Sequence, residues 1–129
     1  MKYQEIKAAR EAKQSELFTA CRLFFAFSNK QFEEGKTPKA EGEKYVHIGA
    51  GGYLPKSQVD NFINGMEALN KWERAEIKRH KQADEEIRFE LANHECYYTG
   101  DPSTVIELLP NYDPQRIINV FNTERKKHY

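Results

Sequence analysis

Apolar residues recur at helical spacing between Ser57 and about Asn93, in the longest patterned stretch of the chain. They are dense in its first half, where the spacing of three and four residues predicts a helix face buried against a core. The second half is mostly charged and keeps only a thin apolar seam. No helix breaker lies between Gly65 and Asn93, so the pattern predicts one long helix, or a helix pair that turns near His80–Gln82. The apolar positions are Val59, Phe62, Ile63, Met66 and Leu69, followed by Ile77, Ile87 and Leu91.

The chain before this stretch alternates between helix and strand signals. Residues 2–20 form a charged helical pattern, and the aromatic run Leu23–Phe27 that follows predicts a central strand. Successive strand side chains point to opposite faces, so we expect Phe24 and Phe25 to be covered on both sides by helices. Ser28 resembles a helix cap, and the short helix that it starts should end at Gly35.

Two further strands are predicted around a cluster of glycines. Residues 44–48 alternate as a half-buried strand does, and Tyr53 with Leu54 continues the sheet after the glycines. The fold class is therefore α+β, with a small antiparallel sheet of two or three strands covered by helices. The 129 residues predict one domain, 1–129.

The last thirty residues hold two similar segments, DPSTVIELL from Asp101 and DPQRIINVF from Asp113. An acidic cap followed by proline specifies a helix start, so both segments predict helices that pack together as a hairpin. The alternative is a DNA-binding helix-turn-helix with Arg125, Lys126 and Lys127 on phosphates. The formal net charge of zero argues against DNA as a partner. In that alternative the residues facing the bases are Gln115, Arg116, Asn119 and Asn122.

Composition places the chain among polar globular proteins, with 39% hydrophobic and 31% charged residues. No apolar run approaches the roughly 18 residues that span a bilayer, and no signal-peptide pattern is present, so we expect a cytoplasmic protein without membrane contact. Cys21 and Cys96 are expected to be reduced.

The glycine cluster between the last two predicted strands has two interpretations. The first, which the pattern favours, is a tight strand-to-strand turn. The second is a site that binds a nucleotide or another anion. The phosphate-loop patterns fail at Leu54 and Pro55, where glycine would be needed. The residues of the ligand-binding alternative are His47, Gly49, Gly51, Gly52, Tyr53 and Lys56.

The segment from His94 to Tyr98 contains residue types that metals and catalysis use. A single His-x-Cys pair lacks the further ligands that zinc requires at known spacings, so we predict no metal site. No arrangement typical of a catalytic triad is recognisable. The sequence therefore predicts a binding protein without enzymatic activity or cofactor.

The charged half of the long helical stretch is the predicted partner surface. Positions 77, 80, 84, 87 and 91 follow a heptad spacing, which is typical of a helix that associates with another helix. Trp72 lies where the apolar half gives way to the charged half, and tryptophan is enriched among residues that dominate binding. We predict that Trp72, Ile77 and Ile87 contact a host protein or a second copy in a homodimer.

Three blocks resemble an uncharacterised family of small proteins found in bacteriophages and mobile elements of bacteria. They are LFFAFSNKQFEEG at 23–35, YVHIGAGGYLPKS at 45–57 and LANHECYYTGD at 91–101. The resemblance supplies no reaction and no site residue. It implies a viral accessory protein, an anti-defence candidate in the host-cell cytoplasm, that binds and inhibits a host protein or sequesters a signalling nucleotide.

Overall fold

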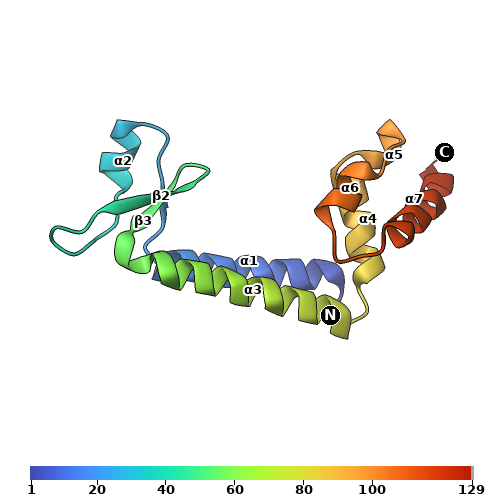
Figure 1. The fold of residues 1–129 in the computed structure, drawn as a ribbon, viewed down its shortest axis with the longest axis horizontal. Helices are drawn as coiled ribbons and strands as arrows, with labels where there is room; N and C mark the ends of the chain where they lie inside the picture. Colours follow the sequence, from blue (N-terminus) through green and yellow to red (C-terminus); the bar gives the residue numbers. More distant parts are fainter. Residues whose placement is uncertain (129) are drawn as a thin grey trace. The chain divides into compact units, whose positions relative to one another are not determined.

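Helices dominate the computed structural model, which describes residues 1–128, and a three-stranded antiparallel sheet accompanies them (Figure 1). The α+β class is thus confirmed.

Contacts within the chain divide it into two units: unit 1 is Met1–Tyr3 with the chain from Glu76 onward, and unit 2 is Gln4–Ala75. The prediction of a single domain stays a prediction. The elements are α1 (Tyr3–Ala20), β1 (Phe24–Phe25), α2 (Asn29–Gly35), β2 (Tyr45–Gly49), β3 (Gly52–Pro55), the 3₁₀ helix η1 (Lys56–Gln58), α3 (Val59–Arg79), α4 (Ala83–Asn93), α5 (Cys96–Thr99), α6 (Ser103–Leu108) and α7 (Pro114–His128).

The sheet of unit 2 has the strand order β1-β3-β2. The aromatic run therefore forms an edge strand, and the prediction of a central strand there is wrong. The strand β1 is also shorter than predicted. Arg22, in the left-handed region at φ 57°, ends α1, and Ser28 already caps α2 by accepting a hydrogen bond from the Gln31 N–H (3.1 Å). These two boundaries leave room for only two paired residues, Phe24 and Phe25.

One face of the sheet is packed against α2, and the other is more open. Phe24 is buried, with its ring centroid 5.3 Å from that of Phe32 on α2 and 5.7 Å from that of Tyr53 on β3. Phe25 points to the opposite face and is 52% exposed. The expectation that helices cover both sides of this strand is only partly met, because α2 covers the Phe24 side, whereas Phe18 of α1 contacts the Phe25 ring and leaves half of that side chain exposed.

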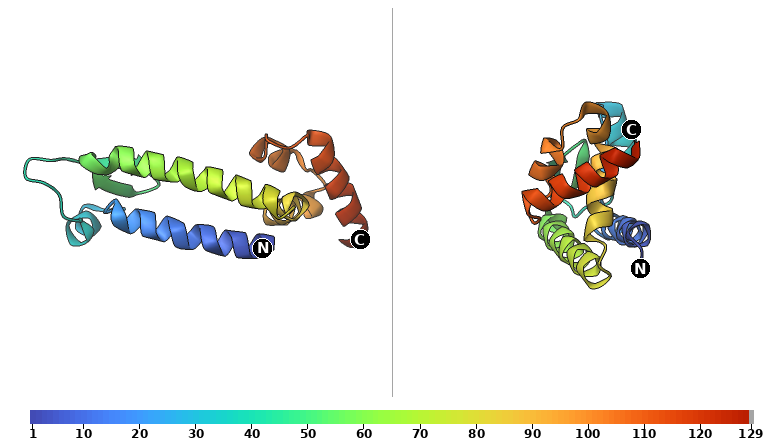
Figure 2. Two further views of the ribbon diagram at one scale, coloured as in Figure 1. Left: turned by 90° about the horizontal axis from the view of Figure 1, so that it is seen from below. Right: turned by 90° about the vertical axis from the view of Figure 1, so that its right-hand side faces the viewer.

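In unit 2, α1 and α3 run side by side and antiparallel, as the two views of Figures 1 and 2 show. Gly65 allows their close approach, since a Cβ at this position would lie 2.4 Å from a methyl carbon of Leu17. Towards the other end the seam is polar. There Arg10 donates a hydrogen bond to the Asn70 side chain (2.9 Å) and forms an ion pair with Glu73 (3.6 Å).

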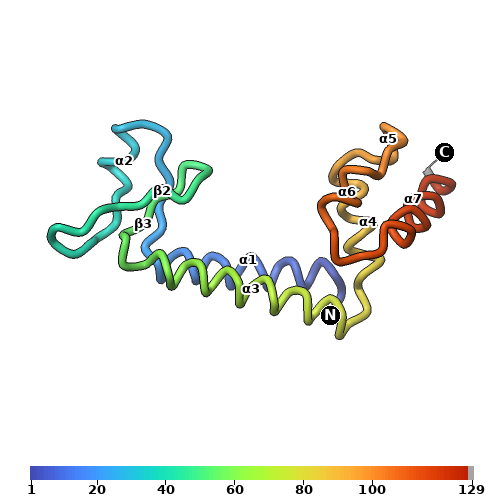
Figure 3. The backbone as a smooth tube through the Cα atoms, in the orientation of Figure 1, coloured from blue at the N-terminus to red at the C-terminus, as the bar shows by residue number. Residues whose placement is uncertain are grey.

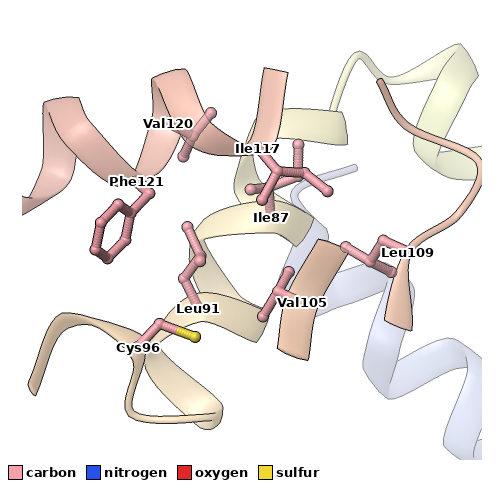
Figure 4. Packing of buried hydrophobic residues seen from close by; sticks show 8 residues of the cluster. All are labelled: Ile87, Leu91, Cys96, Val105, Leu109, Ile117, Val120 and Phe121. Carbon is pink, nitrogen blue, oxygen red and sulfur yellow. The ribbon is translucent and has the colours of Figure 1, made fainter. Parts of the chain in front are cut away.

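The helices of unit 1 enclose an apolar core between α4, α5, α6 and α7 (Figure 4). Both predicted helix starts are confirmed, because Asp101 accepts a hydrogen bond from the Ser103 N–H (2.9 Å) and Asp113 accepts one from the Gln115 N–H (2.8 Å). The core consists of Ile87, Leu91, Cys96, Val105, Leu109, Ile117, Val120 and Phe121.

The long helical stretch is a helix pair, the second of the two predicted forms. α3 ends at Arg79, and α4 begins at Ala83. Lys81 takes the left-handed conformation at φ 54°, and the Gln82 N–H donates to the Ile77 carbonyl (2.8 Å), as in a Schellman cap. This cap usually requires glycine, which explains why the sequence carries no signal for the turn.

Candidate protein-binding surface

The largest exposed apolar side chains of unit 2 gather where the sheet meets the helices. Phe25 is 52% exposed, Phe27 77% and Ile63 48%. The half-buried ring of Phe18 lies beside this group, because its centroid is 6.4 Å from that of Phe25 and 5.9 Å from that of Phe62, which precedes Ile63 on α3. We define the aromatic surface as Phe18, Phe25, Phe27, Ile48, Phe62 and Ile63.

Glycines in the β2–β3 turn allow the outer part of this surface to form. The ring of Phe27 lies directly over Gly51, where a Cβ would come within 2.4 Å of a ring carbon. The side chain of Ile48 covers Gly52 in the same way, at 3.1 Å from the place of a Cβ. Gly52 is also the cross-strand neighbour of Phe25. The apolar side chains therefore cover backbone rather than other side chains, and their outer faces stay exposed.

The edge of β1 adds a backbone feature to the aromatic surface. The Ala26 N–H donates to the Gly51 carbonyl (2.9 Å), so Ala26 and Gly51 form a hydrogen-bonded pair. Because such pairs alternate along an antiparallel ladder, Phe25 belongs to a non-hydrogen-bonded pair and directs its own N–H and C=O away from β3. The most exposed residue of this strand thus combines an apolar side chain with outward-facing peptide groups.

The structure separates the three residues of the predicted partner surface. Ile77 is 2% exposed and Ile87 is fully buried, both within unit 1, so neither is available to a partner. Their interpretation as an exposed seam is wrong, because the turn at Lys81 interrupts the heptad spacing and Ile87 packs into the core of unit 1. Trp72 remains at the surface of unit 2, half-buried, with the Lys13 Nζ 5.0 Å from its ring centroid.

The glycine cluster forms a β-hairpin turn, which confirms the favoured interpretation of this segment (Figure 3). Gly49 pairs with Gly52, and the two residues between them, Ala50 and Gly51, have φ angles of 50° and 76°. Positive φ at both positions is typical of a type I′ turn. The remaining residues of the ligand-binding alternative are partly brought together: His47 and Tyr53 are cross-strand neighbours with ring centroids 4.8 Å apart, and Lys56 is exposed at the start of η1.

The helix start beside the glycine cluster, where the ligand-binding alternative would place an anion, already holds a carboxylate of the chain. Glu43 accepts hydrogen bonds from the backbone N–H groups of Ser57 (2.5 Å) and Ala40 (2.9 Å). Hydrogen bonding from Ser57 lowers the pKa of Glu43 to about 2, and the bond from Ala40 adds to this effect. A phosphate at this place would have to displace Glu43, so this geometry does not favour nucleotide binding there.

Several basic residues of α7 interact with groups of their own unit. Arg116 forms an ion pair with Asp84 (2.9 Å), and Lys127 forms one with Glu124 (3.2 Å). The guanidinium of Arg125 stacks over the ring of Phe121, 5.7 Å from its centroid. These contacts compete with phosphates for the basic groups, so the arrangement gives no support to the DNA-binding alternative.

The segment from His94 to Tyr98 holds two candidate metal ligands that make separate contacts. The His94 Nε2 lies 3.3 Å from a carboxylate oxygen of Glu90, and Cys96 is a buried thiol, as is Cys21. Burial raises the pKa of both thiols. Within residues 1–128, no three His, Cys, Asp or Glu side chains gather where they could share a metal ion. In the same part of the chain, no helix has both the length and the apolar content needed to cross a membrane.

The fold is that of a small α+β protein, and several large apolar side chains of unit 2 are exposed. The chain belongs to a family of unknown function, DUF7659, whose model matches residues 2–127. No curated protein and no solved structure matches it. The sequence analysis missed the aromatic surface because it placed Phe25 under a helix. The available signal was the shortness of the run between Arg22 and Ser28, which cannot supply a long central strand.

Proposed function

We propose that the protein acts by binding another protein through the aromatic surface, without catalysing a reaction. The observation that carries this proposal is the exposure of Phe25, Phe27 and Ile63, all in unit 2, in a chain whose mean hydropathy is −0.86. Large exposed apolar areas on otherwise polar proteins mark interaction sites. Phenylalanine side chains bury much area on binding and have few rotamers to immobilise, which favours affinity.

The proposed partner is a protein of the host cell, in line with the resemblance to small accessory proteins of bacteriophages. An extended segment of the partner, added beside β1, would meet the peptide groups of Phe25 and place apolar side chains against the exposed rings. Binding of this kind would inhibit the partner if the bound segment belongs to the partner's own active or binding site. This makes the protein an anti-defence candidate.

The test is affinity capture from an extract of the host cell, with the bound proteins quantified. The double variant Phe25→Ser and Phe27→Ser should lose the partner by roughly tenfold or more, because two anchors of the surface are removed. The matched control is Tyr98→Ser, which changes an aromatic residue that is 86% exposed in unit 1. Capture by the double variant equal to that of the parent and the control would refute the proposal.

A further inference from the structure

We infer that unit 1 binds an organic cation, a quaternary ammonium or guanidinium group, in the hollow beside α5 that a carboxylate and tyrosine rings line. The hollow has a volume of about 360 Å³, within the range of roughly 300 to 1,000 Å³ that is common for ligand pockets. The site lies outside the proposed function, because the aromatic surface belongs to unit 2. The residues lining the hollow are Ala92, Glu95, Tyr97 and Tyr98.

The short helix α5 holds the exposed tyrosine of this site in place. Cys96, its first residue, is 1% exposed, and its side chain points into the core of unit 1 (Figure 4). Tyr98 follows two residues later, which at 100° per residue places it on the other side of the helix, and it is 86% exposed. The Gly100 N–H donates to the Cys96 carbonyl (2.8 Å) and closes the turn. Burial of Cys96 therefore keeps Tyr98 at the surface.

The backbone that carries the carboxylate is equally well fixed. Glu95 takes the left-handed conformation at φ 56°, and its N–H donates to the Ala92 carbonyl (3.1 Å). Its own carbonyl accepts hydrogen bonds from the N–H groups of Tyr98 and Thr99, both at 3.1 Å. The backbone positions of Glu95 and Tyr98 are therefore set by the same turn.

The side chains of Glu95 and Tyr98 make no contact that a ligand would have to break. Glu95 is exposed, and its carboxylate takes part in no hydrogen bond or ion pair within residues 1–128. Tyr98 stacks on no other ring and on no cation in this part of the chain. The neighbouring His94 differs, since its Nε2 lies 3.3 Å from a carboxylate oxygen of Glu90. Both groups that would hold a cation are thus available.

A carboxylate beside aromatic rings is complementary to a cation. The face of a tyrosine ring is the negative part of its quadrupole and attracts an ammonium or guanidinium group, and the carboxylate supplies the opposite charge. An anion would be repelled by Glu95. Asp101 adds negative charge near α5, since burial and, to a smaller extent, this charge raise the pKa of the Cys96 thiol. The Arg125 guanidinium lies over the ring of Phe121, 5.7 Å from its centroid, and Arg125 does not line the hollow.

Titration of the full chain with choline, followed by nuclear magnetic resonance, tests the site. Choline should shift the amide signals of residues 95–100 with a dissociation constant on the millimolar scale, because a small ligand makes few contacts. Its neutral isostere 3,3-dimethylbutan-1-ol, in which carbon replaces the charged nitrogen, should bind at least roughly tenfold more weakly.

N-acetylarginine amide is the second cationic probe and identifies the source of the ligand. Binding tighter than that of choline would indicate an arginine side chain of a peptide, and weaker binding would indicate a small free amine. Saturable binding of neither cation, or binding of the neutral isostere as tight as that of choline, would overturn the inference.

Variants assign the binding to these side chains. Tyr98→Ser and Glu95→Gln should each raise the dissociation constant of choline roughly fivefold to tenfold, because each removes one of the two attractions. Tyr98→Phe is the matched control, which keeps the ring and should bind within roughly twofold of the parent. Parent-like binding by Tyr98→Ser and Glu95→Gln would contradict this site. The Phe25→Ser and Phe27→Ser variant should bind choline as the parent does, which separates this site from the proposed partner binding.

Discussion

Unit 1 and unit 2 differ in how far they bury their apolar residues, although both belong to one charge-rich chain. In unit 1, four helices surround Ile87, Leu91 and Ile117, so even a thin apolar seam becomes fully buried. In unit 2, the α1/α3 pair and a small sheet leave Phe25, Phe27 and Ile63 exposed. The number of layers around a seam decides whether its apolar residues become core or surface. This contrast is the reason why the proposed binding surface lies in unit 2.

The strongest test of this contrast is to place a charge in the core of unit 1. Ile87→Glu should cost more than about 4 kcal/mol of unfolding free energy, because a carboxylate would be buried without a partner among apolar side chains. Thermal unfolding followed by circular dichroism would show the loss.

Leu108→Glu is the matched control for this variant. Leu108 lies in the same unit and is about half exposed, so its new charge stays in water and should cost less than about 1 kcal/mol. Parent-like melting of the Ile87 variant would mean that Ile87 is not core. The earlier interpretation of α4 as a partner-binding seam would then return.

The next prediction concerns two neighbours on the sheet of unit 2. Phe24→Ala should cost roughly 3 to 5 kcal/mol, because the Phe24 ring is buried between α2 and β3. Phe25→Ala should cost less than about 1 kcal/mol, because half of its ring already faces water. Denaturant titration followed by the fluorescence of Trp72, the only tryptophan, reports on this unit. Equal losses for both variants would show that both faces of the sheet are covered.

Local sequence signals predicted several helix starts correctly. They did not predict the turns that end α1 and α3. Ser28, Asp101 and Asp113 marked helix starts that the structure confirms, since a cap depends on a few adjacent residues. The turns at Arg22 and Lys81 place non-glycine residues in the left-handed region, which costs about 1 kcal/mol or more each. Such turns are stabilised by packing of the elements that they join. The residues at these turns therefore show no local sequence pattern that predicts a turn.

The candidate sites were harder to predict than the elements, because exposure depends on layers that only the fold defines. Trp72 was predicted to bind a partner from its position between an apolar and a charged segment; it is half-buried at the surface, and its role in binding stays a prediction. Ile87 has the same kind of charged neighbours in sequence, yet four helices bury it. Phe25 and Phe27 belong to a run that resembles a core strand, and its edge position leaves both exposed.

The smallest expected effect is a pH dependence that arises in unit 2. Hydrogen bonding from Ser57 lowers the pKa of Glu43 to about 2, against an ordinary value of 4.5. A carboxyl group whose pKa is lower in the folded state stabilises the fold above its unfolded pKa, and this stabilisation is lost as the pH falls through its folded pKa. The contribution of Glu43 should therefore be complete above about pH 5 and disappear between about pH 4.5 and pH 2.

Glu43→Gln isolates this contribution, because the amide keeps one acceptor oxygen but carries no charge to titrate. The variant should be less stable than the parent at pH 7, and the difference should shrink towards zero as the pH approaches 2. Urea titrations at pH 7, 4 and 2.5, followed by Trp72 fluorescence, measure the difference directly. Glu41→Gln, an exposed neighbour in the same loop for which we expect no such trend, serves as the control. A difference that stays constant over this pH range would show that Glu43 stabilises η1 without a contribution from its charge.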